Sequence, residues 1–113
     1  MKIKAVVKEP YKAPYVREIE NELEPFQEIV GGYIQVVPVP GVPDAVLVCN
    51  EEGKLNGLEP NLFMNQDIIV GTVIAAGFKG EDFVSLTPRQ ISDVELSLMV
   101  RAMHTPEKIR WEI

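Results

Sequence analysis

Cysteine and histidine are almost absent from this chain of 113 residues. The one cysteine, Cys49, has no partner for an internal disulfide, which fits a reducing compartment and argues against a secreted disulfide scaffold. The one histidine, His104, is far from Cys49 in the sequence, and no spacing typical of metal ligands surrounds either residue. We therefore predict no metal site, and we expect His104 to lie at the end of the last helix.

Long apolar runs are missing as well. No segment reaches the length of about 20 residues that a membrane span needs. The first residues, Met1 to Lys4, are not followed by the apolar stretch of a signal peptide. With 113 residues, 46% of them hydrophobic, the sequence predicts one globular domain over residues 1–113, cytoplasmic and without a membrane partner.

Positive charge is scarce in the middle of the chain. Lys54 is the only cation between residues 18 and 67, and the whole chain has a net charge of −6. An acidic surface repels phosphate backbones at long range, so we expect no direct binding to nucleic acid. A solvated acidic face that keeps the protein soluble is the simplest explanation of this charge. The acids of this region are Glu18, Glu20, Glu22, Glu24, Glu28, Asp44, Glu51, Glu52, Glu59 and Asp67.

Recognisable catalytic motifs are absent too. The sequence has no phosphate loop, no dinucleotide fingerprint and no nucleophile elbow around its serines. Glu51 and Glu52 are adjacent, so on an extended chain they point apart and cannot flank one bond. Cys49 ends a fully apolar run, which is typical of a buried small side chain. We predict no catalytic residue and no cofactor, and we favour a binding protein over an enzyme.

What is present is mostly the pattern of β-strands. Ile3, Ala5 and Val7 alternate with lysines, as in a half-buried strand. The run from Ala45 to Cys49 is apolar at every position, which predicts a central strand covered on both faces. Strands are expected on these grounds at residues 3–8, 15–19, 33–39, 45–49, 67–78 and 83–86, with a bulge or a close backbone approach at Gly71.

A first helix is expected after the second strand. Asn21 is the candidate N-cap and Glu24 its capping-box partner, and Gly31 with the glycine after it provides the C-terminal stop. Pro25 restricts this helix, because proline is tolerated only in the first turn, so Glu24 is the alternative start of the helix.

The second helix has the clearest start in the chain. Thr87 is the predicted N-cap, Pro88 the first helical residue and Gln90 the capping-box partner. We expect it to end at Thr105, with a short strand at residues 109–113 behind it. The order β-β-α-β-β-β-β-α indicates an α+β fold, a mainly antiparallel sheet with two helices on one face.

The candidate binding segment runs from residue 49 to residue 61. It concentrates amides, carboxylates and glycines around Lys54, a point cation suited to an anionic group. Gly53 is expected to adopt the left-handed conformation of a tight hairpin. Asparagines and glycines also form ordinary turns, so this segment is a pocket or only a turn. The predicted ligand-binding residues are Asn50, Glu52, Lys54, Asn61 and Thr72.

Several stretches resemble an uncharacterised family. Residues 16–21, 27–34 and 49–58, with Pro60-Asn61, look like the domain of unknown function 3846 family, whose small members are common in phages and mobile elements. Residues 69–72 and 81–86 are similar to it as well. The chain departs from the family's pattern at Pro25 and after Asn61, where a longer acidic insert is missing. The resemblance implies an accessory protein of a phage or plasmid that acts in the cytoplasm of a host cell.

Two functions follow from these observations as hypotheses. The first is a non-enzymatic accessory protein that binds and neutralises a host factor, by sequestering a small anionic, nucleotide-derived defence signal. The alternative is an acidic protein–protein inhibitor, or a mimic of nucleic-acid charge, that acts on a host defence or regulatory protein. The partner is therefore a small anionic ligand or a host protein, and a homo-oligomer stays open.

Overall fold

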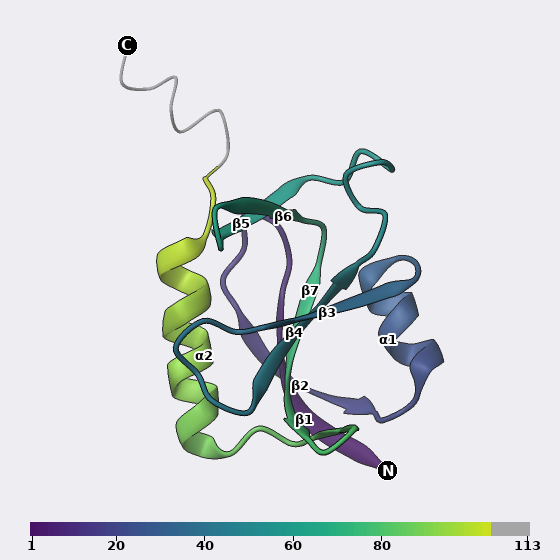
Figure 1. The fold of residues 1–113 in the computed structure, drawn as a ribbon, viewed down its shortest axis with the longest axis vertical. Helices are drawn as coiled ribbons and strands as arrows, with labels where there is room; N and C mark the ends of the chain where they lie inside the picture. Colours follow the sequence, from purple (N-terminus) through teal and green to yellow (C-terminus); the bar gives the residue numbers. More distant parts are fainter. Residues whose placement is uncertain (105–113) are drawn as a thin grey trace.

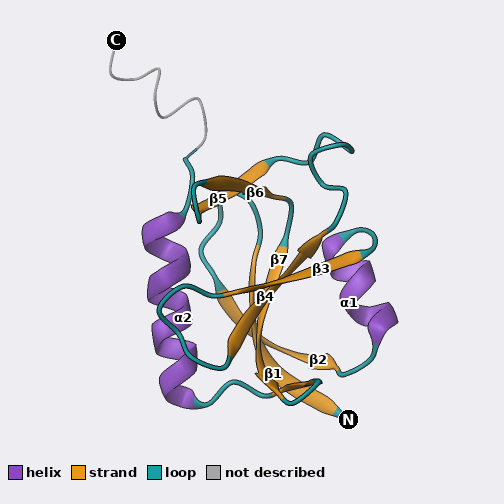
Figure 2. Cartoon of the chain, viewed as in Figure 1, coloured by secondary structure: helices purple, strands orange, loops and turns teal. Residues whose placement is uncertain are grey.

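The computed structural model describes residues 1–104, in which a mainly antiparallel sheet and two helices form an α+β fold (Figures 1 and 2). Five strands follow the order β2-β1-β7-β4-β3 and β8 pairs with β7, while β5 and β6 form a separate hairpin. The predicted strand at residues 109–113 lies outside the described residues. The elements are β1 (Lys2–Lys8), β2 (Tyr15–Glu20), α1 (Leu23–Val30), β3 (Ile34–Pro38), β4 (Ala45–Asn50), β5 (Pro60–Met64), β6 (Asp67–Val70), β7 (Val73–Lys79), β8 (Asp82–Val84) and α2 (Pro88–Arg101).

The two helices cover opposite faces of the main sheet, so the expectation of two helices on one face was wrong. In β4, Leu47 packs in the cluster that contains α2 side chains, whereas the next residue, Val48, packs in the cluster that contains α1 side chains. Successive strand residues point to opposite faces. Because the central strands are apolar at consecutive positions, each face needs its own helix, and Figure 1 shows α1 and α2 on either side of the sheet.

Helix α1 begins differently from the prediction. Its N-cap is Glu22, which makes no side-chain capping bond. Asn21 instead donates its side-chain amide to the carbonyl of Phe83 at 2.9 Å, which ties the helix entrance to β8. Pro25 stands in the first turn, where its missing N–H costs nothing. The predicted stop is confirmed, since Gly31 has a φ of 86° and caps the helix.

Helix α2 begins as predicted. Thr87 is the N-cap, Pro88 is the first helical residue, and Thr87 and Gln90 form a reciprocal capping box. The helix ends at Arg101, four residues before the predicted end, and Ala102 is its C-cap. None of the helices in the described part of the chain is both long and apolar enough to cross a membrane.

The predicted strand over residues 67–78 is two strands in different sheets. Gly71 has a φ of 80° and separates β6, which pairs with β5, from β7, which lies inside the main sheet. Gly53 is not left-handed, and it forms no tight hairpin; Gly57 has the positive φ in that loop, at 71°. Gly53 is needed for space instead, because a Cβ there would meet the side chain of Val70 at 2.7 Å.

Candidate functional site

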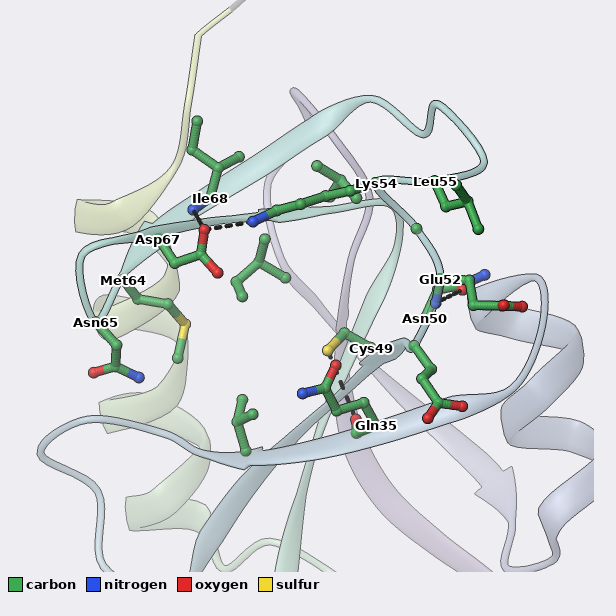
Figure 3. Close-up of a pocket in the computed structure, with 15 residues that line it drawn as sticks. Gln35, Cys49, Asn50, Glu52, Lys54, Leu55, Met64, Asn65, Asp67 and Ile68 are labelled. Atoms are coloured by element: carbon green, nitrogen blue, oxygen red, sulfur yellow. Dashed lines mark hydrogen bonds and ion pairs between the residues drawn. The ribbon is translucent and has the colours of Figure 1, made fainter.

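A groove of about 500 Å³ opens between the edge strand β3 and the β5–β6 hairpin (Figure 3). The hairpin packs over one end of the sheet face that α2 covers, since Leu62 and Met64 belong to the α2-side core. The groove thus continues this apolar layer to the surface. Its apolar lining consists of Val37, Cys49, Leu55, Met64, Ile68, Ile69 and Val70.

The rim of the groove carries more negative than positive charge. Three carboxylates line it, those of Glu51, Glu52 and Asp67, against the single ammonium of Lys54. Lys54 and Asp67 form an ion pair, drawn as a dashed line in Figure 3. The Lys54 hydrogen bond, aided by the backbone N–H of Ile68, holds the pKa of Asp67 below its usual value. Lys54 is therefore on the rim, but Asp67 already offsets its charge.

Asn50 lines the groove but has a structural task. Its side chain is 7% exposed and donates to the carbonyl of Val30 at 3.1 Å. Its oxygen accepts from the backbone N–H of Glu52 at 2.8 Å, which shapes the turn after β4. One amide thus joins the end of α1 to the start of the loop that holds Glu52 and Lys54.

Asn61 lies away from the groove and is fully buried. Its Nδ2 donates to the carbonyls of Lys8 and Gly71, at 2.9 and 2.7 Å, and its Oδ1 accepts from Lys8 Nζ at 2.7 Å. Thr72 is half-buried just before β7 and does not line the groove either. The structure therefore brings Asn50, Glu52 and Lys54 together and separates Asn61 and Thr72 from them.

Several groove residues are absent from the sequence prediction. Gln35 and Val37 come from β3, while Met64, Asn65 and Asp67 come from the β5–β6 hairpin. Asn65 and Gln66 both have positive φ, 53° and 61°, so they form the tight turn of this hairpin. The usual signal for such a turn is a glycine, and none is present, although asparagine also tolerates this conformation.

Cys49 faces the groove without the properties of a nucleophile (Figure 3). It is 4% exposed, and burial raises the pKa of its thiol. A thiol with a raised pKa is protonated at neutral pH, whereas the nucleophilic form is the thiolate. Its Sγ lies 3.7 Å from the carbonyl oxygen of Gln35. Cys49 is thus a small buried side chain, as expected.

Metal-ligating side chains do not gather in the part of the chain that the structure describes. No group of three or more histidine, cysteine or acidic side chains among residues 1–104 is arranged so that it could hold a metal ion. His104, expected at the helix end, lies three residues beyond α2 and is exposed. Within the last turn, Arg101 donates to the Ser97 carbonyl at 3.3 Å, a contact that basic side chains commonly make near the C-terminus of a helix.

Comparison with protein families bears out the resemblance. The model of the family described as Domain of unknown function (DUF3846) matches residues 1–99, most of the chain. No curated protein and no solved structure matches the chain. The family description names no activity, so it assigns no role to the groove. The matched residues include every strand of the described part of the chain, all of α1 and most of α2. The chain belongs to the DUF3846 family.

Proposed function

We propose that this protein binds a small ligand in the groove, without chemical turnover, and that the ligand carries a single negative charge. The observation that supports this most directly is the groove itself. Its volume of about 500 Å³ is within the range of small-molecule sites. It combines apolar walls with a polar rim that includes Lys54 (Figure 3).

The charge of the rim restricts the ligand. Lys54 can leave Asp67 for an anionic group, but Glu51 and Glu52 remain and repel further negative charge. A nucleoside triphosphate is thus disfavoured, whereas a cyclic mononucleotide brings one phosphodiester charge. Its base would lie against the apolar walls, and the amides of Gln35 and Asn65 offer donors and acceptors for base edges.

The family resemblance gives this binding a biological setting. In a phage or mobile element, a protein that sequesters a nucleotide-derived defence signal neutralises the host response without destroying the signal. Sequestration needs affinity and a sufficient amount of protein, and it needs no catalytic residue. A protonated, buried Cys49 and the scattered carboxylates of the rim are compatible with that role.

Two substitutions on the rim test the proposal in opposite directions. Lys54→Ala removes a charged hydrogen bond to the ligand, worth about 1.5–3 kcal/mol, so affinity falls about tenfold to a hundredfold. Asp67→Asn releases Lys54 from its ion pair, so affinity for the same ligand rises. The measurement is titration calorimetry against cyclic mononucleotides and the corresponding triphosphates.

The matched control is Arg89→Ala, which removes an exposed cation on α2, away from the groove. Melting curves check that each variant is folded, and an exposed lysine contributes little to stability. If no cyclic mononucleotide binds the wild type, or if Lys54→Ala binds as well as the wild type does, the proposal is wrong.

A second candidate function is inhibition of a basic host protein by an acidic face. Four carboxylates of the segment 18–28 are exposed, those of Glu18, Glu22, Glu24 and Glu28. Glu20 differs, because it pairs with the N-terminal amine, whose hydrogen bond lowers its pKa. The exposed four offer charge complementarity to a basic partner, which favours this candidate over direct nucleic-acid binding.

A further inference from the structure

A second hollow, of about 220 Å³, lies where the end of β1 and the loop after it meet the end of α2. Its lining differs from that of the groove in charge. Among residues 1–104, its lining contains Lys8, Lys12 and His104 and no carboxylate, in a protein whose net charge is −6. The remaining lining residues are Tyr11, Ala13, Pro14, Met99, Ala102 and Met103. The described lining therefore offers two lysines and no acid in an acidic molecule.

Lys8 is the unusual residue of this hollow. Its side chain is 1% exposed, and Nζ donates to Asn61 Oδ1 at 2.7 Å and to the Glu9 backbone carbonyl at 3.3 Å. Both acceptors are neutral, and no carboxylate in residues 1–104 lies within ion-pair distance of Nζ. A buried ammonium without a counter-charge is costly, and burial lowers its pKa accordingly.

The surroundings hold Lys8 in place. Asn61 Nδ2 is fixed by two carbonyls, those of Lys8 and Gly71, so its Oδ1 must face the ammonium. The carbonyl of Asn61 in turn accepts from the N–H of Met103 at 2.9 Å, which fixes the chain that follows α2. An ammonium has three N–H donors, and these contacts use two of them. The third donor has no acceptor among residues 1–104, so it is available to a ligand that enters the hollow.

We propose that this hollow binds the oxyanion of a small ligand, a carboxylate or a phosphate, with Lys8 as its buried anchor. The anion supplies the counter-charge that Lys8 lacks within residues 1–104, and it accepts the third hydrogen bond of Lys8. Lys12 shares its charge with Glu9 at 3.4 Å and is 70% exposed, so it can turn toward the anion at the entrance. Pro14, Met99 and Met103 form an apolar wall for a short hydrocarbon body.

The experiment uses the full chain and two probes, butanoate and methyl phosphate, which separate the carboxylate source from the phosphate source. Binding is followed by ¹H–¹⁵N NMR in low-chloride buffer, with the side-chain amide of Asn61 as the local reporter. One of the probes is expected to bind with a Kd below about 10 mM and to shift this signal. Lys8→Met is expected to weaken binding at least about tenfold, the loss of one charged hydrogen bond.

Two further variants keep the result interpretable. Lys12→Ala alters an exposed side chain, so it folds regardless of Lys8, and it is expected to weaken binding a few-fold. Lys54→Ala removes the groove lysine and is expected to leave binding of the probes in the hollow unchanged. A negative result for the hollow is therefore distinct from a negative result for the groove. The proposal is wrong if neither probe binds the wild type. It is also wrong if the wild type, Lys12→Ala and a folded Lys8→Met all bind the probe equally well.

Discussion

Asn61 connects three parts of the fold through one side chain. Its amide group contacts β1 through Lys8 and the β6–β7 junction through Gly71, while its backbone carbonyl receives the N–H of Met103 beyond α2. Lys8 and Gly71 are buried together with it, and among the described residues no buried side-chain polar atom lacks a hydrogen-bond partner. The residue predicted to touch a ligand is therefore a structural residue.

Replacing Asn61 should destabilise the protein strongly. Asn61→Ala leaves two buried carbonyls unpaired, each at a cost of about 1–3 kcal/mol, so we expect the free energy of unfolding to fall by about 3 kcal/mol. Urea denaturation followed by circular dichroism measures this change. Asn56→Ala is the control, since Asn56 is exposed in the loop before β5 and should change stability by less than about 0.5 kcal/mol. Equal stability of the two variants would contradict the assigned role.

Lys8 and Lys54 are the same residue type, but they differ in burial and in whether their charge is offset. Lys54 is exposed and has a carboxylate partner, so its charge is screened by solvent and offset by Asp67. Lys8 is buried among neutral acceptors and lacks such a partner within residues 1–104. The sequence directs attention to Lys54 because it is isolated among acids. Only the contact between Asn61 of β5 and Lys8 of β1 reveals Lys8.

At the scale of the elements, α2 is the part whose start the sequence specifies most fully. The Thr87 hydroxyl accepts from the Gln90 N–H at 3.1 Å, and the Gln90 side chain accepts from the Thr87 N–H at 2.9 Å. Gln90 also donates to the carbonyl of Pro43 at 3.1 Å, which joins the helix start to the β3–β4 turn. The cap thus contributes to tertiary packing as well as to the helix.

Removing this cap has a predictable cost. Thr87→Ala should lower the free energy of unfolding by about 1 kcal/mol through loss of the N-cap bond. Ser92→Ala, at an exposed position inside the same helix, should be neutral or slightly stabilising, because alanine is the better helix former. Thermal melts recorded by circular dichroism compare the two variants. A Thr87→Ala melt that coincides with the wild-type melt would show that the cap is energetically irrelevant.

The β5–β6 hairpin is the element that creates the groove, and local sequence signals describe it least well. The run from Asp67 onward is continuous in β-branched and apolar residues, so it reads as one strand. The only sign in the sequence that this run divides into β6 and β7 is Gly71 itself. Asn65 and Gln66 both adopt the left-handed conformation although neither is glycine. The strained conformation persists because the pairing of β5 with β6 holds both residues in place.

At the scale of the whole molecule, charge is distributed unevenly. Three of the exposed acids, Glu22, Glu24 and Glu28, lie at the start of α1 or within it, while the lysine and histidine hollow lies at the end of α2. A basic partner would be attracted to the α1 side. Association of that kind is driven by long-range charge and weakens as salt screens it.

The acidic-face candidate is tested by reversing two of these charges. Glu24→Lys with Glu28→Lys should reduce capture of basic host proteins by the immobilised chain, and rising salt should reduce capture by the wild type. Asp93→Lys with Glu95→Lys changes the net charge equally, but on α2, so it controls for charge alone. Capture that is independent of salt, or reduced equally by both double variants, would rule out a specific acidic face.

The sequence alone determines the type of most elements and the class of the fold. Alternation in β1, the apolar run of β4, the Gly31 stop and the Thr87 cap are local properties, because each depends on residues a few positions apart. Family membership also follows from the sequence, through the stretches that resemble the DUF3846 family. Among the predicted site residues, Asn50, Glu52 and Lys54 lie together because they are neighbours in one loop.

The tertiary structure decides which faces are covered and which polar groups remain available to a ligand. The apolar central strands require two covering layers, but only the chain path places α1 on one face and α2 on the other. Asp67 reaches Lys54 from 13 residues away, and Asn61 reaches Lys8 from 53 residues away. These contacts join positions distant in sequence, where periodicity and capping rules carry no information. They offset the charge on Lys54 and leave Lys8 without a counter-charge among the described residues.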